Sequence, residues 1–523
     1  MKRFIDKHSE KIDGTLSCFD RVIIKGYLPF SYPKGMEDFL TINKILIKDF
    51  KHYAPKLAAI ITEHAKELAA DSKRPYEYLN FRGRKEEYVR NIINRDNIKE
   101  GLVCVLSALE TCVSFKICYG EGRPRLEMAR RKCRCIYFYY IDREFGLMYV
   151  RIQTWFPFTT QIYINGHEWL ARKMNRHGIT YKKVENVFIQ ISDYQRAQKF
   201  VDNMPNLNFP RILDTFANRV NPLMSGMLSP VKYKWIIEQA EYSTDIVFKN
   251  YSELASIYPQ LLKHATLCFS AEDVMTFLGR KMSGHFEGEI RNSYKRRLPG
   301  ARVKHWMKTN WLKMYNKEGR VLRIETVINN PREFKVRRWG MHKGEVVFDW
   351  FAMCKRIGNF RRYSQVGLAS NQRYANALSV VDNPREAFQA LDGVSRRKKI
   401  HGRSIRGFNT ISVEDIKLFK AVLCGEHNIN GFRNKDIRCK LFIQTSDKHK
   451  MKHQSTKVTR LFTILHAHKL IAKVPRTRRW RVTLDGHKVM STAITLRDDV
   501  FYHTYMKTLK TILKLSKSST QAG

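Results

Sequence analysis

The sequence predicts a multi-domain protein of mixed α+β and α/β class, and three observations favour this. The chain has 523 residues, enough for about two to four domains that each bury a core. Its hydrophobic content of 43% and aromatic content of 12% are typical of a folded chain and not of a disordered basic tail. Strand-like and helix-like runs alternate along most of the sequence, without an internal repeat or a low-complexity segment.

Positive charge is the strongest feature of the composition. The chain contains 95 Lys and Arg residues against 49 Asp and Glu residues, a formal net charge of +46. Such an excess repels itself unless a polyanion neutralises it, and each phosphate contact releases bound counterions. We therefore expect DNA or structured RNA as the partner. A ribosomal-type protein, or a basic protein that is merely soluble, is the alternative.

Cysteine spacing and hydropathy indicate the cellular compartment of the protein. The ten cysteines include no CxxC pair, and Cys133-Arg-Cys135 does not have the spacing of a zinc site. The N-terminus lacks the apolar core of a signal peptide, and no run reaches about 18 apolar residues. We expect a cytoplasmic, nucleoid-associated protein with no membrane partner. The oligomeric state cannot be inferred.

Residues 1–100 are predicted to form one strand and a basic helical region. The strand covers residues 15–30, and alternation places Asp20 on the same face as Cys18, Val22 and Ile24. A carboxylate among apolar neighbours needs a cation, a metal or a raised pKa. Asp20 is therefore a candidate metal ligand, and a buried salt bridge is the alternative. Helices are expected over 36–71, interrupted at Pro55, and over 80–97.

Residues 101–225 are predicted to form an α/β core. After strands at 101–117, the order β-β-β-α-β-α is expected over segments 136–141, 147–155, 161–164, 166–177, 186–191 and 193–204. This order resembles the first part of an RNase H-like fold, the scaffold of many metal-dependent nucleases and transposases. The resemblance implies metal-binding acids near the ends of elements, and the candidates are Asp142, Glu168 and Asp193. Each also fits a local role, in a turn, a helix capping box and a helix N-terminus respectively.

Residues 226–345 are expected to complete this core through a helical insertion and a basic β-hairpin. Helices are predicted over 209–223, 233–248 and 252–284, and the hairpin pairs residues 310–317 with 320–328. A basic stretch at 291–308 precedes the hairpin. The candidates for nucleic-acid contact in this region are Arg302, Lys304, Lys313, Tyr315, Lys317 and Arg323.

Lys313-x-Tyr315-x-Lys317 followed by Leu322-Arg-x-Glu325 resembles a motif of filamentous-phage and plasmid replication initiators. The resemblance implies that Lys313, Lys317 and Arg323 hold phosphates and that Glu325 binds a metal. Such initiators also need a His-hydrophobic-His metal pair and a nucleophilic tyrosine. The candidate pair, His466-Ala-His468, lies at the end of an expected helix, where side chains two residues apart diverge.

Residues 411–500 follow a basic linker at 346–410 and precede a basic tail at 501–523. Three helices are expected, opening at Ser412, at 434–442 and at 455–468, and then two strands flank a basic tip at 475–479. This order resembles a winged helix-turn-helix, which implies that the third helix lies in the major groove. The DNA-contacting candidates are Lys457 and Arg460 on that helix and Arg476, Arg478 and Arg479 on the wing. A winged helix used for protein contact is the alternative.

Hydrolysis of phosphodiesters with two metal ions needs carboxylates that converge from different strands. The candidate catalytic and metal-ligating residues are Asp20, Asp142, Asp193 and Glu325, which would hold Mg²⁺ or Mn²⁺. The favoured function is a metal-dependent nuclease or transposase-like enzyme of a mobile element. The alternatives are a non-catalytic DNA- or RNA-binding regulator with a winged helix and a replication initiator.

Overall fold

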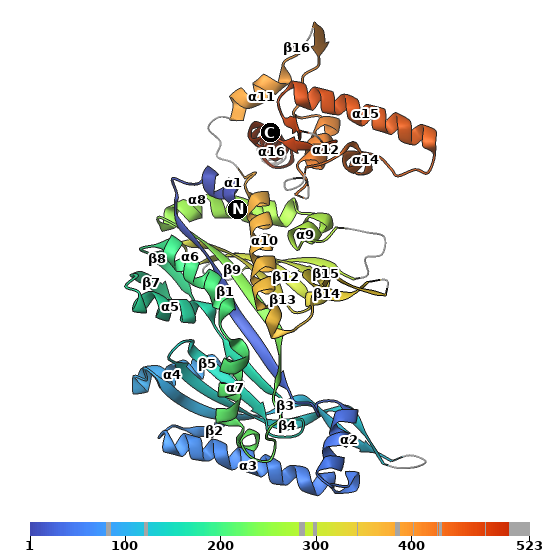
Figure 1. Cartoon of the computed structure of the whole chain (residues 1–523). Coiled ribbons are helices and arrows are strands. Elements are labelled where there is room, and N and C mark those ends of the chain that lie inside the picture. Colours follow the sequence, from blue (N-terminus) through green and yellow to red (C-terminus); the bar gives the residue numbers. More distant parts are fainter. Residues whose placement is uncertain are drawn as a thin grey trace, which may run out of the picture.

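An eleven-stranded β-sheet runs through the body of the molecule, and helices pack against it (Figure 1). The computed structural model describes residues 1–79, 85–119, 124–281, 288–296, 301–342, 344–381, 387–400, 402–425, 427, 431–475 and 477–501. Over these residues the protein is mixed α/β, as the sequence predicts. Among them, no helix has both the length and the apolar character needed to cross a bilayer.

The sheet has the strand order β10-β11-β12-β13-β9-β1-β6-β5-β4-β3-β2. Only β2 and β3 are parallel, and every other neighbouring pair in the sheet is antiparallel. The strands are β1 (Ile12–Tyr27), β2 (Tyr76–Tyr78), β3 (Gly101–Cys118), β4 (Arg125–Asp142), β5 (Gly146–Gln153), β6 (Thr160–Ile164), β9 (Lys234–Phe248), β10 (Ile290–Arg296), β11 (Ala301–Met307), β12 (Asn310–Lys317) and β13 (Val321–Ile328).

Two halves of similar topology meet at the pair β1–β9. In the first half, β1 is followed by α2 (Pro33–Ile42) and α3 (Phe50–Asp71), and later by the meander β3–β6, whose last strand returns to β1. In the second half, β9 is followed by α8 (Tyr251–Leu267) and α9 (Ala271–Phe277), and then by the meander β10–β13, whose last strand returns to β9. The halves share strand order and not residues, so a search of the sequence for repeats does not detect them.

Alternation along the strands gives the second half of the sheet a covered face and a polar face. On β12, Leu312 and Met314 are buried, whereas Lys313, Tyr315 and Lys317 stay partly accessible. The covered face packs against helix α10 (Phe360–Leu378), which contacts β9 and β13. We use "polar face" below for the face that carries Lys313 and Tyr315.

A β-bulge in β1 changes which residues share a face. The register with β9 shifts between Phe19 and Arg21, so Phe19 stacks on Phe360 on the covered face while Asp20 lies on the polar face. Val22 and Ile24 then belong to the core on the covered side. The expectation that Asp20 shares a face with Val22 and Ile24 is wrong, because simple alternation does not anticipate the extra residue.

The central segment contains the predicted elements and one further strand, β7, but it does not form an RNase H-like sheet. Strands β4, β5 and β6 are followed by α5 (Gly166–Arg176), β8 (Val187–Ile191) and α6 (Tyr194–Asn203). However, β8 pairs with β7 (Tyr181–Val184) in a separate two-stranded sheet and does not join the large one. The RNase H-like arrangement is therefore not confirmed.

Two further expectations are wrong. The segment 233–248, expected as a helix, is strand β9, whose last nine residues are all buried at the centre of the sheet. The segment 346–410, expected as a basic linker, contains the buried helix α10 and part of the hairpin formed by β14 (Lys335–His342) and β15 (Glu345–Ala352). Arg361 of α10 is exposed, whereas Tyr363 and Val366 of the same helix are buried in the core.

Most of the remaining helices lie in the first half of the chain and flank the sheet. They are α1 (Lys2–Lys7), α4 (Lys85–Asp96) and α7 (Phe209–Val220). Helix α3 continues through Pro55, which lies in its first two turns. The expected break at this proline therefore does not occur.

The C-terminal residues form a unit with a hydrophobic core of its own, at the end of the molecule opposite α3 (Figure 1). Its elements are α11 (Ala387–Ser395), β16 (Lys398–Ile400), β17 (Arg403–Ile405), α12 (Val413–Val422), α14 (Asn434–Leu441), α15 (Lys448–Ala467), β18 (Ile471–Lys473), β19 (Trp480–Val482) and α16 (Leu484–Thr495). Strands β18 and β19 form an antiparallel hairpin after the third of the helices α12, α14 and α15. This is the order of elements that the sequence predicts.

Buried neutral histidine makes the fold sensitive to acid. His305 on β11 is fully buried, with Nδ1 2.8 Å from Asn292 Oδ1 and Nε2 3.0 Å from Tyr374 Oη. Burial lowers the pKa of His305 to about 4. Between that value and the unfolded pKa of about 6.5, the unfolded chain binds a proton that the folded chain does not, so stability falls as the pH falls through this range.

We expect His305→Gln to remove up to about 3 kcal/mol of this acid destabilisation between pH 6.5 and pH 4. Urea unfolding of the variant and the parent protein at several pH values measures it. Equal slopes of stability against pH in the two proteins would mean that His305 is not the group responsible.

Candidate metal centre on the polar face

Three carboxylates meet on the polar face at the middle of the sheet. Asp20 on β1, Glu241 on β9 and Glu325 on β13 each offer an oxygen, and these oxygens all lie within 4.8 Å of one another. The three strands are neighbours, and the ladder pairs Arg21 with Glu241 and Ser243 with Glu325. The residues are only 8%, 9% and 1% exposed. Carboxylates that are buried so closely need cations to compensate them.

Lys313 and Tyr315 on β12 supply the nearest compensation. The Lys313 ammonium forms an ion pair with Glu325 and lies 3.9 Å from Glu241 Oε2. The Tyr315 hydroxyl donates to Glu325 Oε2 at 2.8 Å. Cross-strand pairing of Lys313 with Glu325 fixes the first of these contacts.

The pKa values of Glu241 and Glu325 are shifted in opposite directions, upward for Glu241 and downward for Glu325. Burial would raise the pKa of Glu325, but the Lys313 ammonium outweighs it and holds this pKa at about 2. Burial, together with the negative charge of Glu325, raises the pKa of Glu241 to about 8. A divalent cation at this place would compete with the proton on Glu241 and relieve the repulsion between the two carboxylates.

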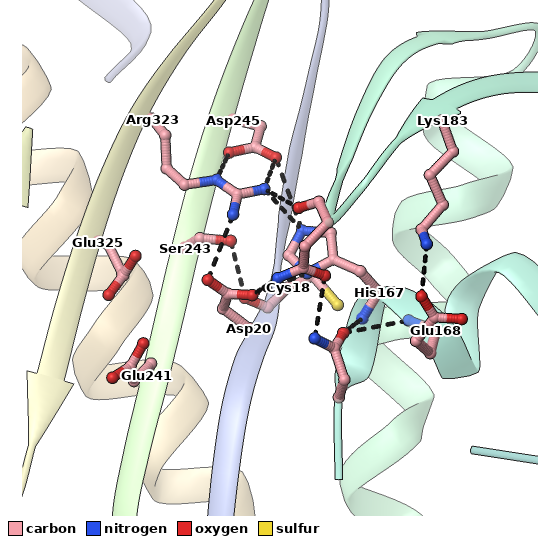
Figure 2. A network of polar contacts seen from close by, with 12 residues as sticks. Cys18, Asp20, His167, Glu168, Lys183, Glu241, Ser243, Asp245, Arg323 and Glu325 are labelled. Carbon is pink, nitrogen blue, oxygen red and sulfur yellow. Dashed lines mark hydrogen bonds and ion pairs between the residues drawn. The ribbon is translucent and has the colours of Figure 1, made fainter. Parts of the chain in front are cut away.

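Arg323 joins β13 to β9 and β1 through ion pairs beside the three acids (Figure 2). Its guanidinium is fully buried and forms a two-pronged ion pair with Asp245, with Nε–Oδ1 and Nη2–Oδ2 distances of 2.6 Å. Its Nη1 atom lies 3.2 Å from Asp20 Oδ2. One arginine thus ties β13 to β9 and β1, and the Arg323 charge helps to hold the pKa of the buried Asp245 well below its usual range.

Helix α5 places a histidine against the acids. Gly166 allows its first turn to approach β1 closely, because a Cβ at this position would lie 2.3 Å from the Phe19 carbonyl oxygen. His167 is fully buried next to it, and its Nδ1 lies 3.6 Å from Asp20 Oδ1. This Nδ1 atom has no hydrogen-bond partner among the described residues. Asn186 donates to Asp20 from the β7–β8 turn.

Two of the predicted ligands lie outside this group. Asp142 closes the turn between β4 and β5, where its Oδ1 accepts from the backbone N–H groups of Glu144 and Phe145. Asp193 is the N-cap of α6 and accepts from the N–H of Arg196. Glu168 forms an ion pair with Lys183 in the first turn of α5. The turn and helix-cap roles that the sequence offered for Asp142 and Asp193 are the ones that the structure shows, whereas Glu168 pairs with Lys183 and the N-cap contacts of α5 come from Asn165.

Glu241 and Asp245 were missed because their segment was interpreted as a helix. On a strand, the spacing Glu241-x-Ser243-x-Asp245 places three polar side chains on one face, whereas on a helix the same residues diverge. All three are buried in β9. Polar residues that alternate within an otherwise apolar run were the signal that could have found them.

A row of cross-strand neighbours leads from the acids toward the sheet edge. Glu325 pairs with Lys313, Lys313 pairs with Lys304, and Lys304 pairs with Ser293 on β10. The Lys304 ammonium lies 3.6 Å from the Trp311 ring centroid and 4.3 Å from that of Trp306. Burial and the charge of Lys313 lower the pKa of Lys304 to about 8.

The other predicted nucleic-acid contacts lie on both sides of this row and in the C-terminal unit. Arg302 pairs with Tyr315 across β11 and β12, and burial lowers the pKa of the half-buried Lys317. Lys457 and Arg460 are exposed on α15, Arg478 is exposed beside β19, and Arg479 is partly buried. Arg476 lies outside the described residues.

No family model, curated protein or solved structure matches this chain.

Proposed function

We propose that this protein is a metal-dependent enzyme that cleaves or transfers phosphodiester bonds in nucleic acid. The observation that carries the proposal is the convergence of Asp20, Glu241 and Glu325 from three adjacent strands within 4.8 Å. Oxygen ligands of this kind suit Mg²⁺ or Mn²⁺. His167 Nδ1, which lies 3.6 Å from Asp20 Oδ1 and has no hydrogen-bond partner among the described residues, adds a polar atom at the same place.

The surrounding residues have separate tasks in this proposal. Asp20, Glu241 and Glu325 would hold the cation, which supplies a Lewis acid for phosphoryl oxygens and lowers the pKa of water. Lys313 and Lys304 would neutralise phosphates of the substrate along their row. Tyr315 orients Glu325, and Arg323 is a positioning residue that keeps Asp20 and the strands in place.

Net charge and the C-terminal unit support nucleic acid as the substrate. The net charge of +46 favours a polyanion, and the order α12, α14, α15 and β18–β19 supports a winged helix-turn-helix that delivers the enzyme to DNA. An enzyme of this kind suits a mobile element.

Cleavage of labelled DNA and RNA by the full chain tests the proposal. We expect cleavage products in buffer with Mg²⁺ or Mn²⁺. We expect none in buffer with EDTA or in buffer without an added divalent metal. Binding of duplex DNA without any metal-dependent cleavage would instead favour the non-catalytic regulator.

The C-terminal unit makes a separate prediction about affinity. We expect Arg460→Ala and Arg478→Ala each to weaken binding to duplex DNA by roughly 1–3 kcal/mol if they contact bases, or to reduce the salt slope by about 1 if they contact phosphates. Titration of the full chain at several salt concentrations measures both effects. Lys488→Ala, an exposed change on α16, is the control, and unchanged affinity in both arginine variants would remove this unit from the DNA contact.

A replication initiator is the second candidate, and the geometry of Tyr315 favours it. The strand pairing sets Lys313 opposite Glu325 and Tyr315 opposite Arg323, which joins two pairs of residues within the motif that resembles such initiators. The His466–His468 pair does not contribute, because His468 Nε2 lies 3.0 Å from the Arg406 carbonyl oxygen in the C-terminal unit. A covalent link between DNA and Tyr315, lost in Tyr315→Phe, would favour the initiator over a hydrolase.

A further inference from the structure

The β14–β15 hairpin exposes an apolar face that nothing in the described chain covers. Cross-strand pairing places Trp339 opposite Phe348, Met341 opposite Val346 and Arg337 opposite Trp350, so these side chains share one face. Trp339 is 67% exposed and Trp350 is 47% exposed. Exposed aromatic clusters of this kind usually mark a binding surface.

Cations accompany the rings on this face. The Arg337 guanidinium lies 5.1 Å from the Phe348 ring centroid, and the Arg362 guanidinium of α10 lies 4.9 Å from that of Trp350. Lys335 lies two residues before Arg337 and therefore shares the face. The two acids of the strands, Glu345 and Asp349, lie on the opposite face. All charged side chains on the aromatic face are therefore cationic. Such a face suits a polyanion as its partner better than an apolar protein surface that carries no acidic residues.

The base of the hairpin is held firmly. The Met353 N–H donates to the Phe334 carbonyl at 2.8 Å, and Arg362 Nε donates to the Lys335 carbonyl at the same distance. Val336 packs against the large hydrophobic core. The rings are therefore presented on an anchored strand pair, and little ordering is needed when a ligand binds.

We propose that this face of the β14–β15 hairpin binds single-stranded nucleic acid by stacking unpaired bases on Trp339 and Trp350. Every base has a flat face, so the contact tolerates different sequences, and Arg337, Arg362 and Lys335 neutralise the neighbouring phosphates. In a duplex the bases are stacked on each other, so these rings reach only strand ends or unpaired segments. The inference rests on the proposed function for its class of partner, and it adds which form of nucleic acid this surface takes.

Binding of a labelled oligothymidylate, which does not pair with itself, tests the proposal. Fluorescence anisotropy of the full chain in EDTA separates binding from cleavage. We expect Trp339→Ala and Trp350→Ala each to weaken binding by about fivefold or more, and Trp339→Phe to retain most of the affinity, because a ring remains for stacking. Tyr32→Ala, an exposed aromatic change before α2, is the matched control and should leave binding unchanged.

Three results would overturn the proposal. The first is unchanged affinity in both alanine variants, with their folding confirmed by circular dichroism. The second is an equal loss of affinity for a blunt duplex, which would mean that stacking of unpaired bases is not the contact. The third is a change in sedimentation of the free protein with no change in oligonucleotide binding, which would assign this face to a second copy of the chain. Absence of metal-dependent cleavage in the parent protein would defeat the proposed function and leave this binding result standing.

Discussion

Replacing Glu325 by Gln is expected to lower metal-dependent cleavage by about 10³-fold or more. Glutamine keeps the size of the side chain but removes one of the three carboxylate charges that converge there. Metal ions contribute several kcal/mol of charge stabilisation to phosphoryl transfer, and each 1.36 kcal/mol corresponds to about tenfold in rate. Initial rates on labelled DNA in Mg²⁺ measure the loss, and calorimetric titration with Mn²⁺ should show weakened metal binding in the same variant.

Two acids outside the group provide matched controls. Asp142→Asn and Asp193→Asn remove the same charge at a turn and at a helix cap, where only backbone N–H groups are bound. We expect both variants to cleave at nearly the parent rate. If Asp20→Asn, Glu241→Gln and Glu325→Gln all cleave normally, the assignment of the metal centre is wrong.

Replacing Arg323 by Met is expected to destabilise the fold by about 3–5 kcal/mol. The change leaves the carboxylate of Asp245 buried without its two-pronged partner and removes the link from β13 to Asp20. Loss of one member of a buried ion pair costs this much because the remaining charge is uncompensated. Urea unfolding followed by circular dichroism measures the effect.

Two comparisons separate the buried ion pair from a general effect of losing an arginine. Arg332→Met, at an exposed position, should change stability by no more than about 0.5 kcal/mol. Arg323→Lys keeps a charge but not the planar pair of donors, so its loss should be intermediate. A stability of Arg323→Met equal to that of the parent would show that the contacts to Asp245 and Asp20 contribute nothing net.

The candidate site could be predicted in part from local patterns. Asp20 was singled out because it lies among apolar residues of a strand-like run, where a carboxylate needs a partner, and Glu325 because it lies in a motif that resembles replication initiators. Glu241 was missed because its segment was interpreted with the periodicity of a helix and not with that of a strand. Asp142 and Asp193 were included because acids in turns and helix caps have the same local sequence pattern as metal ligands. Which acids meet depends on strand pairing between distant segments, such as β1 with β9, and on a bulge beside Asp20. Neither is encoded in local alternation.

The fold was predicted better at the level of elements than of sheets. The elements expected over 136–204 and over the winged-helix segment of the C-terminal unit are present, with β7 as an unexpected addition, because periodicity and turn residues are local signals. Packing between apolar faces that are distant in the sequence decides that β8 lies outside the large sheet. The same packing decides that β1 and β9 lie at the centre of the sheet. Helix α10 shows the same limit. Its many arginines led to the interpretation of a basic linker, although Tyr363, Val366 and Tyr374 form a buried apolar face.

The seam between the two halves of the sheet has a consequence for biosynthesis. Asp20 comes from the first half, whereas Glu241 and Glu325 come from the second, so neither half holds a complete set of ligands. A nascent or truncated polypeptide that ends before β13 lacks Glu325, so cleavage at the proposed metal centre would require both that β13 has been synthesised and that the two halves have paired along β1 and β9.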